Sequence, residues 1–166
     1  VGSAHVRGRP PRARWRGRGA RDRRQRRGGA GRRDDTAGGD PASWFYGIVG
    51  NDQAREPFAD EAITDMTARA VLGLRRASRC GTTTLDRTIY RYSSTCFYEQ
   101  IYIQGGNLLA DAKHRMGSTL FWAAVRDYIE DHRWGLSHTD TLLRALDDAT
   151  PLDLSAGWRS RFPKVY

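Results

Sequence analysis

Residues 58–66 read FADEAITDM, and this stretch decides how the folded part of the chain is interpreted. Pro57 directly before it suits the first turn of a helix, because its fixed φ is already helical. Apolar side chains then recur every four residues along one stripe, at Phe58, Ala62, Met66 and Ala70. The pattern predicts a helix from Pro57 to about Leu72. The same run carries three carboxylates, those of Asp60, Glu61 and Asp65.

The remaining apolar patterns are also helical. Residues 44–49 are typical of the end of an apolar helix, and a further helix is expected from Gln100 or Gly105 to Met116. Gly117 suits the C-terminal cap of that helix, and Ser118 suits the N-cap of the next. Buried helical faces are predicted in two later segments, at Phe121, Val125, Tyr128 and Ile129, and at Leu142, Leu143 and Leu146. Residues 73–98 are polar and predict a loop, and no run predicts a strand, so the fold class is mainly α.

The first quarter of the chain differs sharply from the rest. Residues 1–43 contain 13 of the 28 basic residues and 4 of the 19 acidic ones, and neither Leu nor Ile occurs before residue 48. Such an Arg/Gly-rich, low-complexity leader buries too little apolar area to offset its ordering entropy. We therefore expect a disordered leader at 1–43, which a frameshift would place in a non-native reading frame, and a folded domain at 44–166.

Charge and hydropathy limit the partners. Arginine-rich tails bind nucleic-acid backbones through charge, so the leader predicts adventitious binding of that kind. The remainder carries fifteen bases and fifteen acids, which argues against a nucleic-acid-binding body, since such a body needs a basic face. No run is long enough to span a membrane, and the first residues lack the apolar core of a signal peptide. The compartment therefore stays open.

The three carboxylates have two interpretations. A lone acid pair on a helix is most often a solvated face. The alternative is a zinc site, in which two histidines at i and i+4 bind the metal and a third ligand comes from a neighbouring helix. Glu61 would be that third ligand. Asp65, four residues later, would orient a ligating histidine through its other ring nitrogen.

Residues 44–65, WFYGIVGNDQAREPFADEAITD, resemble the segment that follows the H-E-x-x-H motif in zinc aminopeptidases of the alanyl-aminopeptidase family. The DEAITD part is also similar to the glutamate-ligand helix of thermolysin. Further along, YIQGG at 102–106 resembles the family's YxKGA element, with Gln104 in place of lysine. A helix ending in MG, a VRDY element and a Thr–Asp pair before a helix follow in the family's order, so the resemblance covers 44–166.

The resemblance implies the helical C-terminal part of a thermolysin-like, gluzincin catalytic domain. The family hydrolyses N-terminal peptide bonds of peptide substrates with a zinc ion. Glu61 is implied as a zinc ligand, Asp65 as the partner of a ligand histidine, and Tyr102 as the stabiliser of the oxyanion.

The chain departs from the family at the motif itself. The positions expected to read H-E-x-x-H hold Gly38, Gly39, Asp40, Pro41 and Ala42. None of these side chains supplies a zinc-binding histidine or the glutamate base. We therefore expect a truncated piece that binds no zinc and is inactive alone, joined to an unrelated leader by a frameshift or a misassigned start.

Two alternative functions remain. The chain could be an Arg-rich nucleic-acid-binding protein with a helical body, or a helical interaction domain without catalytic activity. The remaining histidines of this part, His114, His132 and His138, have no i, i+4 partner among themselves, and surface or capping roles are expected for them.

Cys80 and Cys96 flank the loop before Tyr102. They form either a disulfide or two buried thiols, and composition does not decide between these. A disulfide would close a loop of about 15 residues, which is worth up to about 3 kcal/mol in the chain-entropy model. The resemblance to a family with secreted members favours the disulfide.

Overall fold

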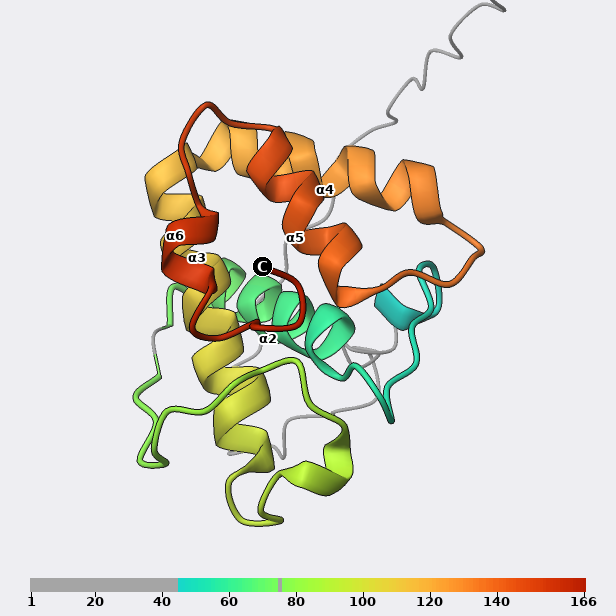
Figure 1. The fold of residues 1–166 in the computed structure, drawn as a ribbon. Coiled ribbons are helices and arrows are strands. Elements are labelled where there is room, and N and C mark those ends of the chain that lie inside the picture. The colour runs from blue at the N-terminus through green and yellow to red at the C-terminus, as the bar shows by residue number, and fades with distance from the viewer. Residues whose placement is uncertain (1–44, 75) are drawn as a thin grey trace, which may run out of the picture. The chain divides into compact units, whose positions relative to one another are not determined.

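The computed structural model describes residues 45–74 and 76–166, and within these ranges it consists of helices and loops without strands (Figure 1). The α-helices are α2 (Phe58–Leu72), α3 (Gly105–Met116), α4 (Ser118–His132), α5 (Thr139–Asp148) and α6 (Ser155–Trp158). There are also a 3-10 turn at Ile89–Arg91 and a π-helical segment at Glu99–Gln104, and Phe45 and Tyr46 are helical at the start of the described part. The predicted leader and Trp44 lie outside the described residues.

Helix α2 has the bounds that the sequence predicts. Pro57 precedes its first residue, and Gly73 ends it in the left-handed conformation with φ 66°. Glycine adopts this φ without the steric cost that a Cβ would add. Three members of the predicted stripe, Phe58, Ala62 and Met66, are buried, whereas Ala70 is exposed on the last turn.

The core forms where α2 packs against the elements that follow it in the chain. The ring of Phe58 meets that of Phe162 edge to face, with centroids 4.6 Å apart. Gly105 permits the close approach of α3, because a Cβ there would lie 3.0 Å from Ala62 Cβ. The predicted apolar faces of α4 and α5 are buried in the same core, with Ile129 only partly so.

Helix α3 begins at Gly105, one of the two starts that the sequence predicts, and it ends at Met116 as predicted. The π-helical segment covers the residues that the earlier start, Gln100, would have made α-helical. Gly117, with φ 87°, ends α3 and also precedes α4, so Ser118 is the first helical residue rather than the N-cap. A π-helical turn advances the chain by an extra residue and rotates the side chains before it relative to those after it. Within this segment the Tyr102 ring stacks on Tyr98, whereas the Gln104 amide donates to Cys80 O.

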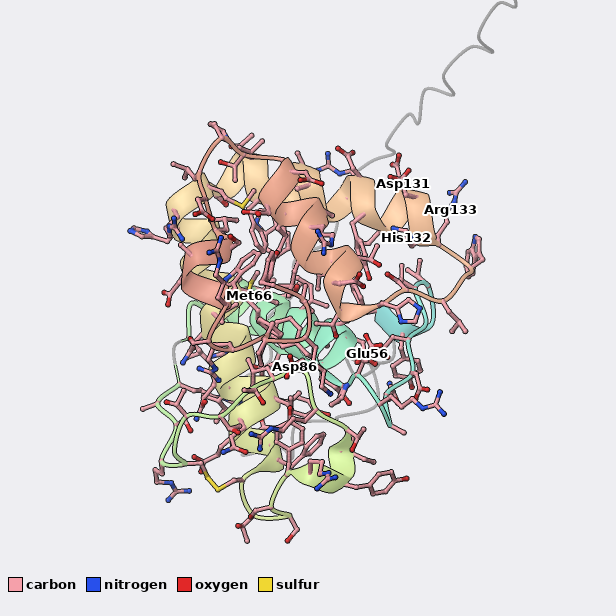
Figure 2. All side chains as sticks on the ribbon, viewed as in Figure 1. Glu56, Met66, Asp86, Asp131, His132 and Arg133 are labelled. Atoms are coloured by element: carbon pink, nitrogen blue, oxygen red, sulfur yellow. A yellow bond between two sulfur atoms is a disulfide. The ribbon has the colours of Figure 1, made fainter. Side chains whose placement is uncertain are left out.

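Two links hold the long loops of the chain in place. Cys80 and Cys96 are joined by a disulfide, visible as the yellow bond in Figure 2. The segment near Gly50 pairs through its backbone with the turn between α4 and α5, where Gly50 N donates to Gly135 O at 2.9 Å and Ser137 N to Gly50 O at 2.8 Å. The second link places the loop before α2 beside the start of α5.

Candidate functional site

Glu61 and Tyr102, which belong to separate motifs of the sequence, interact with each other in the structure. Glu61 lies in the first turn of α2, and Tyr102 lies in the π-helical segment that packs on that helix. The Tyr102 hydroxyl is close enough to the Glu61 carboxylate for the charge of that carboxylate to act on it. Burial raises the pKa of Tyr102 well above its ordinary value, and the neighbouring Glu61 carboxylate raises it further.

Aromatic rings hold Tyr102 in this position. The Tyr98 ring stacks on it with centroids 4.7 Å apart, and the Phe97 ring meets it edge to face at 6.2 Å. Tyr92 in turn packs edge to face on Phe97 at 5.7 Å. Because aromatic pairs of these geometries add stability beyond their buried area, the phenol is well oriented toward Glu61.

Glu61 and several of these aromatic side chains line an open cavity of about 590 Å³. Its walls combine the Glu61 carboxylate and the Gln53 amide with the rings of Tyr90, Tyr92 and Phe97. Apolar walls with a few convergent polar groups are typical of small-molecule sites. The arrangement suits an apolar group that also offers a hydrogen-bond donor or a positive charge to a carboxylate.

Asp60, the neighbour of Glu61, is the most buried carboxylate in the described part of the chain, at 2 % exposure. Its Oδ2 accepts a hydrogen bond from Gln53 Nε2, and its Oδ1 accepts one from the Glu61 backbone N–H at 2.8 Å. Burial raises the pKa of Asp60, and these hydrogen bonds oppose that shift. From the sequence alone, Asp60 is interpreted as one half of an acid pair on a helix. Its position three residues before the core residue Ile63 is the signal that would have predicted its burial, because residues three apart lie on the same face of a helix.

Asp65 has cationic partners in the structure. Its Oδ2 lies 2.6 Å from Arg69 Nε and its Oδ1 lies 3.9 Å from Arg76 Nη1. Arg69 Nε and Asp65 Oδ2 form an ion pair, but their geometry does not meet the criteria for a hydrogen bond. Arg69 also donates to Asn107 Oδ1 at 2.8 Å, so the pair anchors α2 to α3. Orientation of a histidine by Asp65 stays a prediction.

The described residues do not by themselves form a zinc site. Within residues 45–74 and 76–166, no group of three His, Cys, Asp or Glu side chains is placed to hold a metal. A protein zinc site needs at least three such ligands, and Glu61 supplies one. The positions expected for the other ligands lie outside the described residues.

The histidines of the described part lie away from Glu61. His138 Nδ1 is 3.2 Å from Glu56 Oε1, and Glu56 Oε2 accepts the backbone N–H of Thr139 at 2.9 Å, which caps the start of α5. Figure 2 shows Glu56 beside that end of α5 and His132 at the far end of α4, where its ring packs on Tyr128 with centroids 5.1 Å apart. These contacts are structural.

Comparison with protein-family models, curated proteins and solved structures found no match for this chain. None of the helices in the described ranges is long and apolar enough to cross a membrane.

Proposed function

We propose that the helical body of this chain is the ligand-helix part of a gluzincin catalytic domain of the zinc aminopeptidase type, with a thermolysin-like fold. The observation that carries the proposal is the proximity of the Tyr102 hydroxyl to the Glu61 carboxylate. The two residues come from different motifs of the resemblance, and a shared active site requires that they meet. They also meet beside a cavity of a size that accepts an amino-acid side chain.

We further propose that this chain does not hydrolyse peptides alone. Positions 38, 39 and 42 hold Gly, Gly and Ala, which offer no metal ligand and no base. Without a metal and a base no oxyanion forms for Tyr102 to stabilise, and its hydroxyl interacts with Glu61 instead. The body retains the geometry of a hydrolase site and lacks the groups that carry the reaction.

Restoration of the motif tests the proposal directly. The full chain with Gly38→His, Gly39→Glu, Pro41→Leu and Ala42→His should bind about one zinc ion per chain after dialysis against trace zinc, because three ligands are then available. Adding Glu61→Gln should abolish the zinc, whereas Glu130→Gln on the exposed side of α4 should not. A restored chain without zinc, or with zinc that survives Glu61→Gln, would contradict the proposal.

The unaltered chain provides the second test. Metal analysis and an assay with an aminoacyl-arylamide should show neither stoichiometric zinc nor turnover. Turnover that depends on zinc would overturn the proposed inactivity. The DNA upstream of the Trp44 codon can also be translated in its other frames, and failure to find H-E-x-x-H in register there would count against the frameshift.

A further inference from the structure

A second cavity, of about 590 Å³, lies between α3, α6 and the loop that the disulfide closes. Among its lining residues are Ser78 and Cys80 from the loop, Gln104 and Asn107 from the helix, and two arginines, Arg115 and Arg161. It shares no lining residue with the cavity beside Glu61.

Arg161 is the unusual member of this wall. Its Nε donates to Thr83 O at 2.8 Å and its Nη2 to Gln104 Oε1 at 2.8 Å, so both partners are neutral. The ion pairs found among the described residues do not include it. Burial lowers the pKa of this guanidinium below its ordinary value. A partly buried cation normally has an anionic partner, because its desolvation is otherwise uncompensated.

Arg115 brings a second guanidinium to the same cavity. Its Nη2 donates to Asp153 O at 2.9 Å, just before α6, and its Nη1 lies 3.9 Å from the position that a Cβ on Gly157 would take. It too takes part in none of the ion pairs of the described ranges. With Asp111 as the acid in the lining, the wall carries one net positive charge.

We propose that this cavity binds a small oxyanion, a carboxylate or phosphate group, at the guanidinium groups of Arg115 and Arg161. Guanidinium forks match the geometry of both anions and bind them through paired charge-assisted hydrogen bonds. The hydroxyl of Ser160 supplies a neutral donor in the same lining.

The loop wall of the site is held before any ligand arrives. Gln104 Nε2 donates to Cys80 O at 2.9 Å and to Ser78 Oγ at 3.0 Å, while its Oε1 accepts from Arg161. The disulfide to Cys96 fixes the same loop. A site whose groups are already ordered loses less entropy on binding. Reduction of the disulfide should therefore weaken the binding of the anion.

Inorganic phosphate is the probe for the test, titrated into the full chain at constant ionic strength with chloride as the replaced ion. The 13 leader arginines also attract phosphate, so the readout must be resolved by residue. Amide NMR shifts of residues 78–83 and 157–161 should saturate along one binding curve. Acetate in a parallel titration distinguishes a carboxylate site from a phosphate site, and saturation by either anion supports the proposal.

Variants decide whether the arginines cause the shifts. Arg115→Gln should weaken binding about tenfold, and this exposed side chain makes one hydrogen bond, so folding should survive. Arg161→Gln should abolish binding, and Arg144→Gln, whose side chain lines a different cavity, should leave it unchanged. Shifts that never saturate, or that persist equally in both Arg115→Gln and Arg161→Gln, would overturn the proposal.

Discussion

The Tyr102 hydroxyl lies beside the Glu61 carboxylate, where the π-helical segment packs on the first turn of α2. The rings of Tyr98 and Phe97 pack on the Tyr102 ring and hold the phenol in this position. We expect a charge-assisted hydrogen bond between the phenol and the carboxylate, which belongs to the stronger class found in proteins.

Tyr102→Phe removes only the hydroxyl, and we expect it to lower the free energy of unfolding by about 1–2 kcal/mol, because Glu61 loses a charge-assisted partner. Urea denaturation of the full chain measures the change. Tyr90→Phe is the matched control: this ring is 81 % exposed, and its loss of a hydroxyl should change stability by less than about 0.5 kcal/mol. In a double-mutant cycle with Glu61→Gln the two effects should not add, and simple additivity would mean that the bond contributes nothing.

Alkaline pH should unfold the protein through its buried tyrosines. Burial raises the pKa of Tyr92 and of Tyr166 to about 12, and the pKa values of Tyr102 and Tyr128 are also raised. These groups stay protonated in the folded state while the unfolded chain ionises near pH 10, so stability is present below pH 10 and falls as the pH rises above it.

Absorbance at 295 nm and circular dichroism, followed together from pH 9 to 13, check this expectation. Four of the seven tyrosines should ionise late and together with the loss of helical signal. If all seven ionise near pH 10 with the helices intact, the burial of these rings is wrong.

Gly106→Ala should destabilise the protein although alanine is the better helix former. A Cβ at Gly106 would overlap Arg69 Nη2, and that guanidinium is held by Asp65 and Asn107. We expect a loss of about 1–3 kcal/mol, the usual cost of overpacking.

Gly157→Ala in α6 is the matched control for this substitution. The nearest atom to its added Cβ is 3.9 Å away, so helix propensity should dominate and stability should stay equal or rise by up to about 1 kcal/mol. Thermal or urea unfolding of the two variants should give changes of opposite sign. A stabilised Gly106→Ala would show that Arg69 is free to move aside.

Loss of the disulfide should cost about 3 kcal/mol. Cys80 and Cys96 close a loop with a sequence separation of 16, and opening it restores conformational freedom to the unfolded chain. The double variant Cys80→Ser with Cys96→Ser should match the reduced wild type in urea unfolding, and a reductant should have no further effect on it. Equal stability of oxidised and reduced wild type would contradict the expectation.

Much of the fold is predictable from local patterns. The helix over Phe58–Leu72 follows from a four-residue apolar period between Pro57 and Gly73, because helix periodicity and helix ends depend on neighbouring residues. The buried leucines of α5 follow in the same way. The π-helical segment was not predictable, because no short-range pattern marks the insertion of one residue into a helix.

The sequence by itself determined the helix over Phe58–Leu72 and the buried faces of α4 and α5. Its resemblance to a family selected the two residues, Glu61 and Tyr102, around which the candidate site is built. The tertiary structure alone decided what each carboxylate contacts. Asp60 is buried and accepts a hydrogen bond from Gln53, and Asp65 pairs with Arg69. Arg161 has neutral hydrogen-bond partners at the wall of a cavity. The physical reason is that the apolar period of a helix indicates only which of its faces is buried. The desolvation of a carboxylate and its pairing with a cation depend on groups that other segments bring to that face.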